Sequence, residues 1–342
     1  MKKLISLMLA LMLVLSLSTV AFAAETTYTD MSTVTLTKEY TLTNSGTTSP
    51  AETFTFTVPV CTNVEDGGIV NGAVVTKNTA PTFTNDCWSS ISYASGDAGK
   101  TENMTKTATL TLPVFQAVGK YTYTFSEEDN NTAGVSYREG TMSLIIDVIQ
   151  GENNKVRVAH VHAESSTGTK TAIFTNTYSA GSLSVTKNVT GIMGDREKEF
   201  TVKVTFNAPA GDTVREAITY RDGTVDNTIA ANWTGSKDVE ITLKHGETVT
   251  FTNIPYGVTY DVVENNYTAE ADGGYDAATY AFSDDTNKKI DSASDTVTIT
   301  NNKGGTPDTG ITLDSLPFVL ILAVCAGAVV LFVIKRRNSV EF

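Results

Sequence analysis

The chain has 342 residues, of which 41% are hydrophobic, and a formal net charge of −13. This length is enough for two domains of ordinary size between terminal segments. The acidic balance, with no basic patch in the sequence, argues against a nucleic-acid partner, which would need clustered Lys and Arg.

The first 23 residues have the order of a secretory signal. Lys2 and Lys3 precede an apolar run from Leu4 to about Val20, and Ala23 ends an Ala-Phe-Ala sequence of the kind that a signal peptidase cleaves. We expect a signal peptide over residues 1–23 and a secreted chain. The alternative is an uncleaved N-terminal anchor.

The exported part predicts an all-β fold. Threonine, valine and aromatic residues alternate with period two over short stretches that Gly, Asn and Asp separate, as in residues 54–58 and 110–112. Such spacing is typical of β-sandwiches. Only residues 194–199 could form a helical turn.

One pattern occurs twice. Three segments of the first half, residues 34–38, 121–127 and 173–176, have counterparts in the second half at 183–187, 260–264 and 298–301. We therefore predict two tandem β-sandwich domains with immunoglobulin-like folds, over residues 24–179 and 180–303.

Each copy places a lysine, a glutamate and an asparagine on a core-facing side of its strands. Residues two apart share a face, so Lys38 points the same way as Leu36 and Tyr40. By the same reasoning, a further five polar residues are predicted to point toward the core: Glu127, Asn176, Lys187, Glu264 and Asn301.

Buried in this way, the three groups can react. Burial favours the neutral forms of an amine and a carboxyl group. A neutral lysine can attack the asparagine carboxamide while the carboxyl group polarises the carbonyl and transfers protons, which releases ammonia and leaves an isopeptide bond. From the residues alone, a buried Lys–Glu ion pair beside a hydrogen-bonded asparagine remains an equal alternative.

Histidines and cysteines give weaker patterns. His160 and His162 lie two apart on one strand face, but no further ligand is apparent, so we predict no metal site and no cofactor. Cys325 lies in an apolar run, whereas Cys61 and Cys87 share the first domain, where a disulfide or two free thiols both remain open. No pattern indicates turnover of an external substrate, so we expect no enzyme beyond a single internal bond-forming event.

Residues 304–342 have the order of a cell-wall sorting signal. An apolar run over residues 316–334 predicts a transmembrane helix, and the basic residues 335–337 after it place the bulk of the chain outside the cell. Before this run, Thr306-Pro307-Asp308-Thr309-Gly310 resembles the LPxTG motif that sortases cut between Thr and Gly. Thr306 stands where that motif has leucine, which favours a specialised pilin sortase. The alternative is a plain membrane anchor.

The exported part also resembles the isopeptide-linkage domains of FctA-type streptococcal major pilins, within the CnaB-like group of inverse immunoglobulin folds. The resemblance runs through residues 183–187, 194–196, 243–247, 253–260, 264, 300–301 in the second domain, and 38, 121–127, 134–137, 174–176 in the first. It implies isopeptide bonds Lys38–Asn176 and Lys187–Asn301, with Glu127 and Glu264 as their catalytic acids.

The same resemblance implies a Gram-positive pilus shaft subunit at the cell surface. Its partners would be identical pilin subunits, a pilin-specific sortase, and peptidoglycan or its precursor, with tip and basal pilins as further partners. Lys170 matches the position of the lysine that joins subunits, while Lys77, Lys100 and Lys155 stay open. A monomeric wall-anchored adhesin or basal pilin is the alternative, and a secreted hydrolase or receptor is a third reading.

Overall fold

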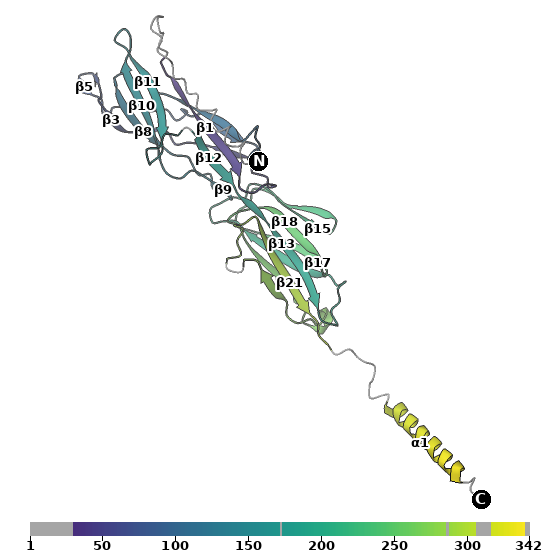
Figure 1. Cartoon of the computed structure of the whole chain (residues 1–342). Coiled ribbons are helices and arrows are strands. Elements are labelled where there is room, and N and C mark those ends of the chain that lie inside the picture. Colours follow the sequence, from purple (N-terminus) through teal and green to yellow (C-terminus); the bar gives the residue numbers. More distant parts are fainter. Residues whose placement is uncertain (1–29, 172, 285–286, 306–315, 339–342) are drawn as a thin grey trace.

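A computed structural model describes residues 30–171, 173–284, 287–305 and 316–338 of the chain. Within these ranges the chain is mainly β, with one long helix, α1 (Leu316–Asn338), and one short 3₁₀ helix, η1 (Glu270–Asp272). Two groups of strands follow each other along one axis, and α1 lies apart from both (Figure 1). Residues 194–199 contain a bend at 196–197 and no helix, so the helical turn that the sequence allowed there is not formed. Over the described ranges, no helix reaches the length and apolarity required of a membrane span.

The first group of strands forms the first β-domain. Its two main sheets have the strand orders β7-β1-β12-β9 and β11-β10-β8-β3, and β2-β6 and β4-β5 form small pairs. The strands are β1 (Thr33–Leu42), β2 (Glu52–Phe54), β3 (Val60–Glu65), β4 (Ile69–Val70), β5 (Ala73–Val74), β6 (Ile91–Tyr93), β7 (Thr105–Thr111), β8 (Gly119–Phe125), β9 (Val135–Ser136), β10 (Met142–Gln150), β11 (Val156–Glu164) and β12 (Ile173–Tyr178).

The second group forms the second β-domain. A six-stranded sheet of order β16-β15-β18-β13-β21-β20 accompanies a three-stranded sheet of order β17-β14-β19. The strands are β13 (Ala180–Thr190), β14 (Phe200–Asn207), β15 (Ile218–Asp222), β16 (Val225–Ile229), β17 (Ser236–Leu243), β18 (Thr248–Pro255), β19 (Thr259–Glu264), β20 (Thr279–Phe282) and β21 (Ser294–Asn302).

Each domain buries the apolar side of both its main sheets in one core. In the first, Leu36 of β1 and Phe174 of β12 share a cluster with Tyr121 of β8 and Leu144 of β10. Along β1 and β8, buried residues alternate with partly exposed ones, and this alternation produces the apolar faces. Any polar residue at an inward position of such a strand must therefore find its partners inside the core.

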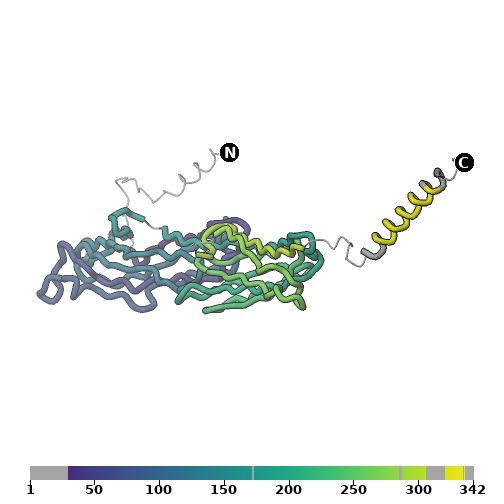
Figure 2. The backbone as a smooth tube through the Cα atoms, turned by 90° about the horizontal axis from the view of Figure 1, so that it is seen from below, coloured from purple at the N-terminus to yellow at the C-terminus, as the bar shows by residue number. Residues whose placement is uncertain are grey.

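The first and last long strands of each domain lie side by side and parallel. β1 pairs with β12 in the first domain, and β13 pairs with β21 in the second. Ser179 alone separates β12 from β13, so the two domains follow each other with almost no linker (Figure 2).

The junction between the domains is hydrogen-bonded on two sides. The amide group of Asn44 donates to Ala180 O at 2.8 Å and to the Tyr256 hydroxyl at 2.7 Å. On the other side, Ala133 N donates to Thr213 O at 3.0 Å, and Ala133 is buried in the core of the second domain. A one-residue linker with hydrogen bonds across the junction on both sides resists bending between the domains.

Candidate sites of intramolecular cross-linking

The first site joins the two parallel strands of the first domain. Lys38 on β1 is fully buried, and Asn176 on β12 is 1% exposed. The register pairs Lys38 with Phe174 and Tyr40 with Asn176, so the lysine side chain extends two residues along the strand pair. Its Nζ contacts Asn176 Oδ1. The predicted pair is thus in contact inside the core.

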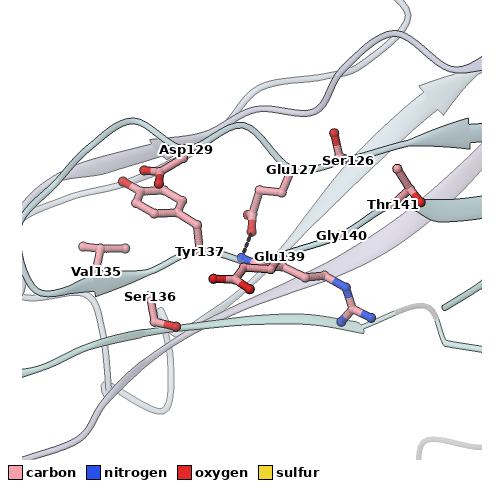
Figure 3. A pocket seen from close by; sticks show the side chains of 10 residues that line it. Ser126, Glu127, Asp129, Val135, Ser136, Tyr137, Glu139, Gly140 and Thr141 are labelled. Atoms are coloured by element: carbon pink, nitrogen blue, oxygen red, sulfur yellow. Dashed lines mark hydrogen bonds between the residues drawn. The ribbon is translucent and has the colours of Figure 1, made fainter. Parts of the chain in front are cut away.

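Glu127 reaches this site from the opposite sheet, two residues beyond the end of β8. Its Oε1 forms an ion pair with Lys38 Nζ, with both side chains almost completely buried. Its Oε2 accepts a hydrogen bond from Arg138 N at 2.8 Å, and both residues line a pocket of about 540 Å³ (Figure 3). The two oxygens thus have different partners, and this fixes the direction of the carboxyl group.

Burial dominates the electrostatics of the first amine. Desolvation lowers the pKa of Lys38 from 10.5 to about 8, against the opposing attraction of Glu127. The Nζ also lies 4.3 Å from the centroid of the Phe54 ring. A lysine with a pKa near 8 is partly neutral at physiological pH and is therefore available as a nucleophile.

The second site repeats this arrangement in the second domain. Lys187 on β13 is fully buried, and its Nζ contacts Oδ1 of Asn301 on β21. The register pairs Lys187 with Ile299 and Val189 with Asn301, which is the same two-residue offset as in the first domain.

Glu264 completes the second site from the other sheet, as the last residue of β19. Its Oε1 lies 2.7 Å from Lys187 Nζ, with both side chains fully buried. Beyond this ion pair, no other hydrogen-bond partner reaches either carboxyl oxygen among the described residues. Desolvation lowers the pKa of Lys187 as well, and its Nζ lies 4.1 Å from the Phe200 ring centroid.

Each arrangement brings together a nucleophile, an electrophile and a proton carrier. In each site the lysine nitrogen contacts both the asparagine carboxamide oxygen and a glutamate oxygen inside the core, where held geometry replaces a bimolecular encounter. In the first site, Asn176 Nδ2 is buried with no hydrogen-bond partner in the described part of the chain. This nitrogen is the group that acyl transfer to the lysine would release.

Several residues of the two sites are missing from the sequence prediction. Arg138 holds Glu127 through a backbone N–H, which no side-chain pattern can reveal. Phe54 and Phe200 read as ordinary core residues of alternating strands, yet their rings lie against the two amines.

The cysteines remain free thiols. Cys61 lies on β3, an edge strand of one sheet. Cys87 is buried and its carbonyl accepts a hydrogen bond from Thr111 N of β7, at the edge of the other sheet. The disulfide that the sequence left open is therefore not formed in this structure.

The remaining predicted residues lie outside these sites. Lys170 is exposed and pairs with Glu164 in an isolated β-bridge just after β11. The signal peptide over residues 1–23 and the motif Thr306, Pro307, Asp308, Thr309, Gly310 lie outside the described residues.

Comparison with known families covers most of the two domains. Residues 89–179 match the Spy0128-like isopeptide containing domain of the FctA family. Residues 181–303 match a second family model, a domain of unknown function designated DUF7601.

Known pilins resemble the chain over most of its length. A pilin from Streptococcus pyogenes serotype M1 is 28% identical over 306 residues, which is 85% of this chain and 86% of that protein. The crystal structure of the major pilin from Streptococcus pyogenes aligns with a TM-score of 0.52 and 25% identity, over 81% of this chain and 100% of that one. The T3.2 major pilin of the same species shares the fold, with a TM-score of 0.52 and 22% identity, over 80% of this chain and 99% of that one. The chain therefore carries a Spy0128-like isopeptide containing domain of the FctA family over residues 89–179, and resembles streptococcal pilins over most of its length.

Proposed function

We propose that the chain is the shaft subunit of a covalently polymerised Gram-positive pilus, built from two immunoglobulin-like domains that each carry one internal Lys–Asn isopeptide bond. The observation that carries the proposal is the duplicated site. Lys38, Glu127 and Asn176 meet in one core, and their counterparts meet in the other with the same strand offset. Two buried lysines in one chain would be costly without such a role.

The reaction conserves atoms within each domain. The neutral lysine Nζ attacks the asparagine Cγ, while the glutamic acid donates its proton to the carbonyl oxygen. The tetrahedral intermediate then expels Nδ2 as ammonia, which carries the proton relayed by the glutamate. One C–N bond forms and one C–N bond breaks, so no oxidant or external energy source is needed.

The placement of the bonds suits a shaft under tension. Each bond would join the first and last strands of a domain, and those strands lead directly into the neighbouring segments of the chain. Pulling force would therefore pass through covalent links from one end of the molecule to the other, without unfolding the sheets.

Polymerisation would use the sorting motif and an exposed lysine. A pilin sortase would cleave between Thr309 and Gly310 and transfer the Thr309 carbonyl to Lys170 of the next subunit, and the last transfer would attach the shaft to peptidoglycan. The exposure of Lys170 supports this role, because an acyl-enzyme can approach it. Retention of the precursor by membrane insertion of residues 316–334 stays a prediction from the sequence.

Cell-wall extracts test the assembly. We expect a ladder of SDS-resistant species from cells that express the chain with its sortase, and loss of that ladder in Lys170→Ala. Lys155→Ala, in the turn between β10 and β11, is the matched control and should keep the ladder. A single discrete wall-linked band from the unaltered chain would instead identify a monomeric surface protein or a basal pilin.

A further inference from the structure

Two histidines lie on the solvent side of the first domain, away from both cross-linking sites. His160 and His162 project from one face of β11, the edge strand of its sheet. Their ring centroids are 4.8 Å apart. The side chains are 54% and 18% exposed respectively, so an ion from solvent can reach them.

The two rings face each other through equivalent nitrogens. His162 Nδ1 lies 3.2 Å from His160 Nδ1. On the far side of its ring, His162 Nε2 lies 2.9 Å from Glu164 Oε1. A neutral imidazole that donates Nε2–H to this carboxylate leaves a lone pair on Nδ1, aimed at the other histidine. A carboxylate behind a ring in this way is the usual support of a metal-binding histidine.

The neighbouring strand adds charge of both signs. Asp147 on β10 is the register partner of His160, and its Oδ2 lies 3.5 Å from His160 Nδ1. Lys120 on β8 is in turn the register partner of Asp147, and it is paired with Glu65 at 3.3 Å. A cation at the histidines would be attracted by Asp147 and Glu164 and repelled by Lys120.

We propose that His160 and His162 form a two-nitrogen chelate for a borderline transition-metal dication such as Zn²⁺, Ni²⁺ or Cu²⁺. Two nitrogens bound to one tetrahedral Zn²⁺ at about 2.0–2.1 Å are about 3.3 Å apart, close to the separation of the two Nδ1 atoms. No group of three or more ligating side chains is ready to hold a metal in the described ranges. The remaining coordination positions therefore belong to water, with Asp147 supplying nearby negative charge.

Titration calorimetry of the purified chain with ZnCl₂ and with NiCl₂ tests the proposal. We expect one binding site per chain, with affinity reduced at least tenfold by His160→Ala and by His162→Ala. Asp147→Asn should weaken binding by a few fold. Lys120→Ala should strengthen it by a similar factor, because it removes the repelling charge. Mg²⁺ should not compete, since it prefers oxygen ligands.

The matched control is His245→Gln, because His245 is the remaining histidine of the chain and lies in the second domain. The affinity of the His245→Gln variant for Zn²⁺ should equal that of the unaltered chain. Lowering the pH to 5 should release the metal, because protons compete for the imidazole nitrogens. Equal Zn²⁺ affinity in the unaltered chain and in both site variants would overturn the proposal, as would an equal loss in His245→Gln.

Discussion

The two domains hold the same three side chains in different scaffolds. Both place a lysine and an asparagine on parallel first and last strands with a two-residue offset, and both bring the glutamate from the opposite sheet. They differ in nearly everything else, with two four-stranded main sheets in the first domain and sheets of six and three strands in the second. The arrangement of these three side chains is therefore what the domains have in common, and two different sets of sheets hold it in place.

The glutamates show the most informative difference. Glu127 is held by the Arg138 backbone N–H, whereas the Glu264 carboxyl group has its ion pair with Lys187 and no other hydrogen-bond partner in the described ranges. The second glutamate is instead placed through its backbone, where Glu264 N donates to the Tyr280 hydroxyl at 2.9 Å. Glu127 is fixed through its carboxyl group and Glu264 through its backbone N–H, and in both cases a carboxyl oxygen reaches the lysine.

The largest expected effect is the loss of one cross-link at a time. Asn176→Ala and Asn301→Ala would open loops with sequence separations of 138 and 114 residues. By analogy with disulfides, each closed loop stabilises its domain by about 5 kcal/mol through the unfolded state, so the two losses should be nearly equal.

Guanidinium unfolding can resolve the domains separately. Trp88 lies in the first domain and Trp233 in the second, and the chain has no other tryptophan. Single-tryptophan variants therefore report one domain each by fluorescence. A cross-link variant that destabilised both domains alike, or neither, would contradict the independence of the two sites.

A smaller effect should appear in the pH dependence of the domain without its bond. In Asn176→Ala, the amine of Lys38 stays free, with a pKa lowered from 10.5 to about 8 by burial. The unfolded state then binds more protons than the folded state between pH 8 and 10.5, so stability should rise with pH across that window. The gain is on the order of 3 kcal/mol.

Lys38→Met in the same background is the control for this slope. It removes the titrating amine and keeps an unbranched side chain, so the rise between pH 8 and 10.5 should disappear. A slope that survives this substitution would show that other groups cause it.

The smallest effect concerns the junction between the domains. Gly134 has φ +79°, and a Cβ at this position would lie 2.6 Å from Ser179 O. Gly134→Ala should therefore destabilise the junction by about 1–3 kcal/mol, from backbone strain and the clash with a carbonyl. Both ammonia losses should remain. Gly140 also has a positive φ, but a Cβ there would lie in open space. Gly140→Ala therefore measures the backbone strain without the clash.

Alternation along the strands was sufficient to predict the six core-facing polar residues. The period of two assigns each residue to a face, and the apolar neighbours identify the buried face, as with Lys38 between Leu36 and Tyr40. Strand order and register depend on contacts between distant segments, so the sequence could not show that Lys38 lies beside Phe174.

Other features could not be predicted from the sequence, because they too depend on contacts between distant segments. Asp147 reaches His160 only through the pairing of β10 with β11, so its position beside the histidines could not be predicted from the sequence. Buried Glu52 accepts hydrogen bonds from Asn130 and Thr132, a cluster that no local pattern marks. Whether Cys61 and Cys87 form a disulfide stayed open because the sequence does not give the distance between two residues.

The intact mass of the folded, purified chain tests the central claim most directly. We expect a mass lower than the encoded value by two ammonia molecules, with peptide mapping that links Lys38 to Asn176 and Lys187 to Asn301. Glu127→Ala and Glu264→Ala should each restore one ammonia, whereas Glu128→Ala, next to the first site but exposed, should restore none. A folded, unaltered chain with the full encoded mass would contradict the account.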